Sequence, residues 1–371
     1  MAYTGRATFD DSDSIGEDVS PIVTIISPLE TPLLSYLGNP LYPATNTKHE
    51  FLTASANAFT DPLAEDLDNS ETGIDVTDGT KFVAGMIIQI DDELMIVASV
   101  ATNTLTVSTR PYGSSTAATH STGATVTIVG WPALEGADAA ASRNTSRTRA
   151  YNYTQIFAET VDVSGTEIAV NQIGVANEYE WQKQLRTAEL LRQLELAVMR
   201  SSLPAATPQG SSSVRRTMKG IQYTFSTNSD NASSATLTKD ILDGYIRDAW
   251  TGGARGMNLI VVNAFQKSKI DGFLTSARRY GPMDQSIKTL VDVYQTSFGQ
   301  MDVMLNHNVP DDEVWMLDTS LIKVLPLQGR SFQHVALGKT GDAQRGQIVG
   351  EYTLEMKNEA GHARVYGLAT S

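Results

Sequence analysis

The sequence contains no cysteine, which excludes disulfide bonds, thiolate metal sites and a cysteine nucleophile. It also contains no apolar run approaching the roughly 20 residues that a helix needs to span a bilayer. The N-terminal segment MAYTGRATFDDSDS carries acids where a secretory signal carries bases, and it has no apolar core. We therefore expect a soluble protein that is made in a cytoplasm and has no membrane partner.

Basic charge is scarce. Lys and Arg number 28 against 42 Asp and Glu, and the formal net charge of −14 argues against an open basic groove for nucleic acid. The acids concentrate in residues 1–70, where eleven acids and two bases give −9. Three bases, Arg143, Arg147 and Arg149, stand together without an acid among them. We interpret the acidic N-terminal arm and this basic strand either as complementary surfaces between copies of the chain or as solvated faces.

Motifs for catalysis are also missing. Gly338–Thr340 resembles the end of a phosphate-binding loop, but Gln333 stands where that pattern needs glycine. Asp66 begins a calcium-like loop that fails because its sixth position is Glu71 instead of glycine. The histidines form no local zinc pair, and there is no G-x-S-x-G elbow for a serine hydrolase. The sequence therefore predicts no catalytic, cofactor-binding or metal site, and we expect a protein that is not an enzyme.

Extended and β structure dominates the first half. The prolines of residues 20–45 predict an extended segment with one short helix at 30–37, and residues 47–53 are typical of a strand. Residues 73–130 are rich in Val, Ile and Thr, with turn signals every 8–12 residues, which indicates a small all-β module. Strand-like sequence resumes at 151–165. The module therefore looks inserted between two strands.

The clearest helix is predicted at residues 176–202 and ends before Pro204. Its apolar side chains recur at spacings of three and four, which predicts one buried stripe. The predicted core residues of this helix are Trp181, Leu185, Leu191, Leu194 and Val198.

Helices and strands are mixed in the second half. Thr238 is placed to cap a helix at 240–250, and a buried strand at 258–264 precedes a helix at 265–274. Three further strands are predicted at 290–296, 301–305 and 313–317, and the C-terminus is predicted to form a β-hairpin over 347–368. The residues alone thus predict an α+β protein with long extended arms, a profile that favours a structural or assembly role.

Five segments in order along the chain carry a family resemblance: ISPLETPLLSYLG (26–38), KHEFLTAS (48–55), ALEGADA (133–139), NYTQIFAETVDVSGTEIAV (152–170) and ELLRQLELAVMRSS (189–202). The sequence resembles the major head proteins of tailed bacteriophages, specifically the group similar to the head protein of the enterobacterial phage with an unusually elongated head. The resemblance implies the tailed-phage capsid fold, with an N-terminal arm, a long hairpin called the E-loop, a spine helix, a peripheral (P) domain and an axial (A) domain.

Carried onto this sequence, the resemblance implies seven segments. They are 1–46 as the N-terminal arm, 47–65 as the first E-loop strand, 66–132 as an inserted β domain, 133–165 as the E-loop return strand, 166–204 as the peripheral domain with the spine helix, 205–320 as the axial domain and 321–371 as the peripheral-domain strands. The inserted β domain is the departure from the family pattern.

The resemblance also implies a function. Copies of the chain would assemble as pentamers and hexamers into the icosahedral phage head around double-stranded DNA, which they would contact non-specifically. Further expected partners are a separate scaffolding protein, a portal and a decoration protein, with assembly in the host bacterial cytoplasm and a final location in the virion. The candidate inter-subunit contacts are Arg143, Arg147, Arg149, His49, Glu50, Phe51, Arg278 and Arg279. Two alternatives are an encapsulin-like compartment shell and a β-rich phage adhesin or tail-associated binding protein.

Overall fold

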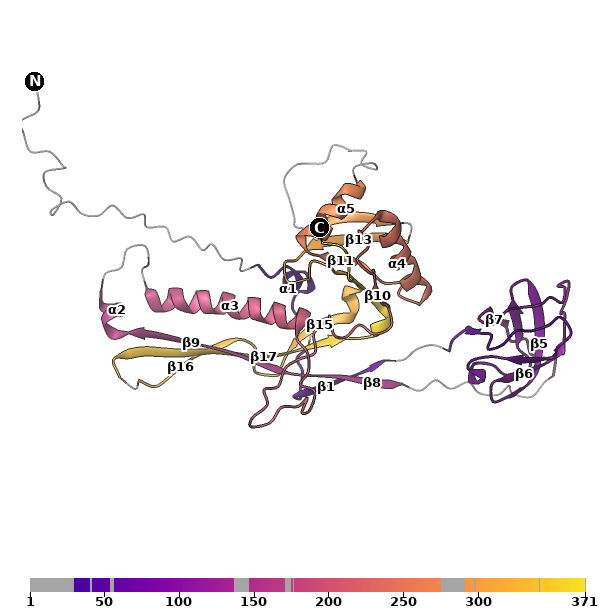
Figure 1. Cartoon of the computed structure of the whole chain (residues 1–371). Coiled ribbons are helices and arrows are strands. Elements are labelled where there is room, and N and C mark those ends of the chain that lie inside the picture. Colours follow the sequence, from indigo (N-terminus) through magenta and orange to yellow (C-terminus); the bar gives the residue numbers. More distant parts are fainter. Residues whose placement is uncertain are drawn as a thin grey trace, which may run out of the picture. The chain divides into compact units, whose positions relative to one another are not determined.

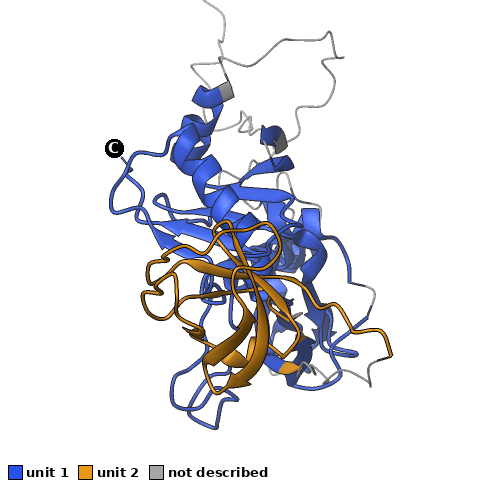
Figure 2. Ribbon diagram, turned by 90° about the vertical axis from the view of Figure 1, so that its right-hand side faces the viewer, with its two compact units in different colours: residues 1–52, 149–371 blue, residues 53–148 orange. Residues whose placement is uncertain are grey.

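The computed structural model describes residues 30–40, 42–53, 57–136, 147–170, 175, 177–274, 291–296, 298–339 and 341–370 (Figure 1). The chain divides into two compact units, which Figure 2 distinguishes by colour. Unit 1 comprises Met1–Leu52 and Arg149–Ser371, and unit 2 comprises Thr53–Thr148. Arg143, Arg278 and Arg279 lie outside the described residues.

The helices of unit 1 are α1 (Pro32–Leu37), α2 (Gly165–Ala169), α3 (Glu178–Arg200), α4 (Lys239–Thr251) and α5 (Ala264–Leu274). Its strands are β1 (Lys48–Thr53), β8 (Thr148–Tyr153), β9 (Gln155–Ser164), β10 (Ser229–Asn231), β11 (Leu259–Val262), β12 (Val291–Thr296), β13 (Gly299–Leu305), β14 (Val314–Leu317), β15 (Ile322–Pro326), β16 (Gln333–Ala336), β17 (Ala343–Met356) and β18 (Ala363–Tyr366), with β1 and β8 extending into unit 2 by one residue each. Short 3₁₀ turns lie at Thr319–Leu321 and Glu359–Gly361.

The long helix α3 forms as its sequence predicts. The Asn177 side chain accepts a hydrogen bond from the Glu180 backbone N–H, two acids stand in the first turn, and Arg200 stands in the last. These features satisfy the exposed helix ends and complement the helix dipole. The helix packs along β9 and β17, which run beside it (Figure 1).

The buried face of α3 differs in part from the predicted stripe. Leu194 and Val198 are buried as expected, whereas Trp181 and Leu185 are only half-buried. Leu191 is 38% exposed, so its prediction as a core residue is wrong. The neighbouring Leu190 is buried instead, because the face toward the sheet continues from Leu190 to Leu194 at a spacing of four.

A four-stranded sheet lies against α3. Strand β17 is 14 residues long and pairs antiparallel with β9 along its first ten residues, Ala343 to Tyr352. On its other edge β17 pairs with β16 and then with β15. Apolar side chains of α3, β9, β15 and β17 join one core, which also includes Trp315 of β14.

The second sheet of unit 1 has six strands in the order β10-β18-β14-β11-β13-β12. Residues of α4 and α5 share a core with residues of this sheet. The Thr238 hydroxyl accepts a hydrogen bond from the Ile241 N–H, so the predicted cap of α4 is present.

The predicted C-terminal hairpin over 347–368 is wrong. Strand β18 pairs with β14 and β10 in the six-stranded sheet, whereas β17 pairs with β9, β15 and β16. Asn358 adopts a left-handed conformation (φ 47°) and a 3₁₀ turn follows, which directs the chain away from β17. The final strand therefore completes the sheet that residues 229–317 otherwise form, instead of joining the strands of 321–356.

Unit 2 is a small β structure with strands β2 (Thr60–Pro62), β3 (Gly73–Asp75), β4 (Ile87–Ile90), β5 (Glu93–Ala101), β6 (Thr104–Thr109) and β7 (Thr125–Gly130). Their order is β2-β7-β4-β5-β6-β3, and a bridge between Leu63 and Val76 links the two edges. The sheet thus closes toward a barrel, which leaves little open edge for unwanted pairing. Because β2 pairs with β7, this structure begins before the predicted boundary at residue 66.

A buried ionic network lies inside unit 2. The Glu93 carboxylate accepts hydrogen bonds from Arg110 Nε (2.8 Å) and from the Ala118 N–H (3.0 Å), and it lies 2.9 Å from His120 Nε2. Burial opposes ionisation of Glu93, but these contacts outweigh it and lower the pKa of the carboxyl. The network joins β5 to the 110–120 segment.

Candidate inter-subunit interface

Four of the predicted contact residues, His49, Glu50, Phe51 and Arg149, lie on a two-stranded ribbon, and Arg147 directly precedes its second strand. Strand β1 pairs only with β8 among the described strands, and the Thr53 and Thr148 hydroxyls lie 2.8 Å apart across it. Arg149 Nη1 lies 3.2 Å from Glu50 Oε2, and Lys48 Nζ lies 2.6 Å from Glu50 Oε1. The ribbon thus brings Glu50 and Arg149 together within one chain. Exposed pairs of this kind contribute little stability, so both groups remain available to a neighbour.

The base of the ribbon is attached to the body of unit 1. His49 Nε2 lies 2.6 Å from Glu355 Oε2, and Glu355 also receives hydrogen bonds from Tyr42 and Lys357. Burial opposes ionisation of Glu355, but the His49, Lys357 and Tyr42 contacts outweigh it and lower its pKa to about 2. Phe51 is buried in its own chain. His49 and Phe51 therefore hold the ribbon against the body of their own chain.

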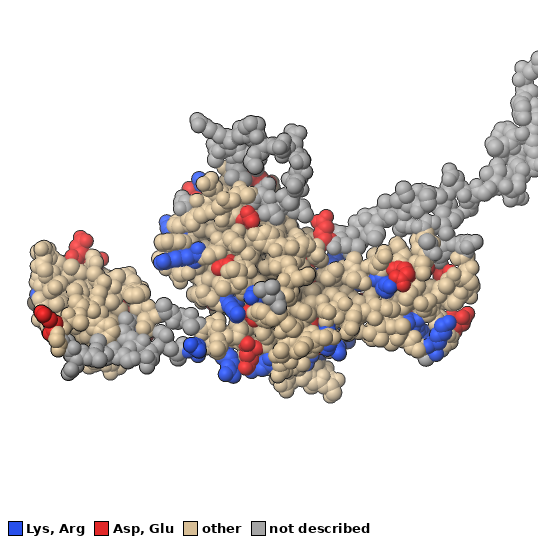
Figure 3. Space-filling view, turned by 180° about the vertical axis from the view of Figure 1, so that it is seen from behind, with Lys and Arg blue, Asp and Glu red and all other residues tan. Residues whose placement is uncertain are grey.

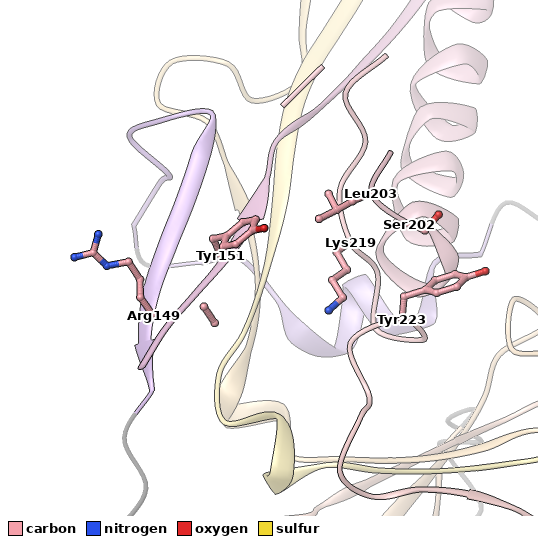
Figure 4. Close-up of a pocket in the computed structure, with 7 residues that line it drawn as sticks. Arg149, Tyr151, Ser202, Leu203, Lys219 and Tyr223 are labelled. Atoms are coloured by element: carbon pink, nitrogen blue, oxygen red, sulfur yellow. The ribbon is translucent and has the colours of Figure 1, made fainter. Parts of the chain in front are cut away.

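An open pocket of about 480 Å³ lies beside the ribbon (Figure 4). Its lining residues are Arg149, Ala150, Tyr151, Ser202, Leu203, Lys219 and Tyr223. Tyr151 and Tyr223 are 45% and 55% exposed. Figure 4 shows the Arg149 guanidinium extending away from Lys219, so the two bases do not compete for one position. The sequence prediction missed Lys219 and Tyr223, although KGIQY is a basic and aromatic segment directly visible in the sequence.

A second hollow, of about 440 Å³, lies between β9 and the C-terminal half of α3. Leu196, which is 44% exposed, lines it as an apolar side chain. Leu191 adds a further exposed apolar side chain to the same helix. Figure 3 shows Lys and Arg interspersed with Asp and Glu over the visible face. That face therefore offers mixed-charge contacts rather than one broad basic field.

A buried carboxylate of α3 holds helix α1 in place. Glu195 of α3 is fully buried, and its oxygens lie 3.5 and 3.4 Å from the Leu33 and Leu34 N–H groups of α1. Asn306 Nδ2 donates to Glu195 at 2.6 Å. Burial is the main cause of the raised pKa of Glu195. Because α1 has no side-chain cap of its own, Glu195 takes that role from another helix.

The described residues contain no group of three or more His, Asp or Glu side chains placed to hold a metal ion. None of the described helices is long and apolar enough to cross a membrane.

Three solved structures that share this fold are capsids. The capsid of a native GTA particle covers 99% of this chain and all of its own, with a TM-score of 0.55 at 8% identity. The capsid of cyanophage A-1(L) gives 0.53 at 10% identity, covering 99% of this chain and 100% of its own. The capsid of Myoviridae phage XM1 gives 0.51 at 10% identity, covering 95% and 97%. The predicted α+β tailed-phage capsid fold is thus confirmed.

The family model for the SU10 major capsid protein matches residues 2–369, and the chain belongs to that family. No curated protein matches the sequence significantly. The chain is therefore a major capsid protein, a shell subunit of a phage head. The narrower likeness to the enterobacterial phage with an elongated head stays a prediction.

Proposed function

We propose that copies of this chain associate as pentamers and hexamers into a closed icosahedral shell around double-stranded DNA. The single observation that carries the proposal is the family match over residues 2–369. The ribbon β1–β8 supports it, since a two-stranded ribbon is only marginally stable alone and gains from packing on another surface. The exposed leucines of α3, Leu191 and Leu196, are a second surface that a neighbour would cover.

The domain roles follow from the elements. We assign α1 and the residues before it to the N-terminal arm, the ribbon to the E-loop and α3 to the spine helix. The four-stranded sheet would be the peripheral domain, and the six-stranded sheet with α4 and α5 the axial domain. Unit 2 would be a β domain inserted into the E-loop, since its chain enters after β1 and leaves before β8.

The net charge of −14 determines how the shell would interact with DNA. An acidic protein repels phosphates, so the genome would be held by confinement and contacted non-specifically. The expected partners are a separate scaffolding protein, a portal and a decoration protein, with assembly in the host cytoplasm. The subunit would act without catalysis. The family match favours this function over a compartment shell and over an adhesin.

Light scattering coupled to size-exclusion chromatography tests the proposal on the full chain. We expect particles whose mass corresponds to many chains. A protein that stays monomeric, even when it is co-expressed with the phage's other head proteins, would contradict the proposed function.

The three bases of residues 143–149 give a sharper test. Replacing Arg143, Arg147 and Arg149 together by alanine should weaken assembly and leave the folded chain intact, because these side chains are expected to meet acids of a neighbour. Arg247→Ala removes an exposed base on α4 that pairs with the adjacent Asp248, and it serves as the control. Normal particles from the triple variant would show that these three bases do not act between subunits.

A further inference from the structure

The pocket beside the ribbon combines exposed aromatic rings with excess positive charge. Tyr151, Leu203 and Tyr223 provide apolar surface, and Lys219 lies among them (Figure 4). Lys219 Nζ has no ion-pair partner within the described part of the chain, which is unusual for a half-buried lysine beside a pocket. A pocket of this composition suits a ligand that carries both an aromatic ring and carboxylates.

Two bases besides Lys219 add positive charge around the pocket. Lys48 Nζ lies 4.5 Å from the centre of the Tyr151 ring, and Arg149 lines the pocket's edge. Glu50, which pairs with both Lys48 and Arg149, is the acid that offsets them. Three bases against one acid leave two net positive charges on an otherwise acidic chain. The pocket is therefore a local exception to the charge of the whole molecule.

The chain itself contains a segment of the matching chemistry. Residues 9–13 read Phe-Asp-Asp-Ser-Asp, an aromatic ring followed by three carboxylates within four residues. Residues 1–29 as a whole hold five acids and one base. These residues lie outside the described part of the chain, so the inference uses only their sequence.

We propose that this pocket receives residues 9–13 of a second copy of the chain, with Phe9 against Tyr151, Leu203 and Tyr223, and with the three carboxylates beside Lys219 and Lys48. The proposal rests on the proposed function, because it is a contact between shell subunits. The pocket would be a binding site for the acidic arm, and Lys219 would be the residue that attracts the carboxylates of the arm.

The absence of cysteine makes a direct test feasible. One preparation of the full chain carries Ser12→Cys in the arm, and a second carries Ser202→Cys in the pocket. One preparation is isotopically labelled, because the two Ser→Cys chains otherwise have the same mass. The two are mixed, assembled and oxidised mildly, and the cross-linked heterodimer is identified by its intermediate mass. We expect a high yield of the heterodimer. The control replaces Ser202→Cys by Ser121→Cys, at an exposed position of unit 2, and should give no heterodimer.

Charge variants show whether the contact has the proposed chemistry. Lys219→Glu should lower the heterodimer yield about tenfold, because an attraction becomes a repulsion. The matched control Lys239→Glu, at an exposed position on α4, should leave the yield unchanged. Adding Asp11→Lys in the arm should restore the yield with Lys219→Glu.

The outcomes separate this proposal from the proposed function. Shells that form without the heterodimer would overturn the docking site and leave the shell function standing. A preparation without large particles would contradict the shell function, and the heterodimer yield would still decide the docking. In a further preparation that carries both Ser12→Cys and Ser202→Cys on one chain, a cross-link found only within single chains would exclude a second copy as the donor. A pocket cysteine that a DNA oligonucleotide protects from alkylation, with the arm variants having no effect, would assign the site to nucleic acid.

Discussion

Three buried carboxylates organise unit 1 and unit 2 at the scale of single residues. Glu355 receives hydrogen bonds that fix the ribbon, Glu195 caps α1 from another helix, and Glu93 joins β5 to the 110–120 segment. Each would be costly to bury without partners, and each has several. The sequence predicted His49 as a functional residue but missed Glu355, because the two residues are 306 positions apart and no local pattern connects them.

The contacts of Glu355 that hold the ribbon should weaken in acid. The folded pKa of Glu355 is about 2, below its ordinary value of 4.5, so its ionised form stabilises the folded chain. That contribution is fully present above pH 4.5 and is lost as the pH falls from 4.5 toward 2. A shift of this size corresponds to about 3 kcal/mol in the free energy of unfolding.

Urea unfolding of the wild type and Glu355→Gln at several pH values measures this effect. The stability difference between the two proteins should be largest at pH 7 and should shrink as the pH falls below 4.5. A difference that stays constant down to about pH 3 would contradict the role given to the Glu355 carboxylate.

The Glu93 network makes a second prediction. Arg110→Met leaves the buried Glu93 carboxylate without its main cationic partner and should destabilise unit 2 by about 3–5 kcal/mol. Adding Glu93→Leu to that variant should recover most of the loss, because the uncompensated charge is then gone. Hydrogen exchange of the β4, β5 and β6 amides in the full chain reports both effects. Unchanged exchange in Arg110→Met would show that the network is not needed for stability.

At the scale of elements, local patterns predicted well what local chemistry determines. Helix α3 begins and ends within two residues of its predicted bounds, since its cap, its charges and Pro204 act locally. The pairing of strands was predicted less well. The turn after Met356 has the composition of a hairpin, but β18 finds its partners in another sheet, and no feature of residues 347–368 reports which edge is free. The prediction of Leu191 as a core residue was wrong for a related reason, since the adjacent Leu190 and Leu191 fit the helical period almost equally well.

The two faces of α3 can be distinguished by matched substitutions. Leu194→Ala removes a buried side chain and should cost about 2–5 kcal/mol in the free energy of unfolding. Leu191→Ala, at a position 38% exposed, should change that free energy by less than about 1 kcal/mol.

Particle yield then gives the complementary readout for α3. Leu191→Ala should reduce assembly although it leaves the fold intact, since the exposed leucine is expected to lie against a neighbour. If Leu191→Ala unfolded the chain as readily as Leu194→Ala, the burial described for α3 would be wrong.

At the scale of the whole molecule, the fold and the family were predictable because motifs in order along the chain carry them. The pocket beside the ribbon was not predictable, since its lining comes from residues 149–151, from 202–203, and from Lys219 and Tyr223, which only the folded chain brings together. The boundary of the β unit was predicted late for the same reason. Strand β2 is three residues long, and only its pairing with β7 identifies it.

Assembly is the property of the whole molecule on which the account depends. We expect the ribbon and the exposed leucines of α3 to gain further stabilisation from neighbouring copies.

Negative-stain electron microscopy of the purified full chain, at low and raised salt, tests this claim most directly. The account predicts closed shells or rings of pentamers and hexamers. A uniform monomer or trimer under every condition, including co-expression with the phage's other head proteins, would contradict it.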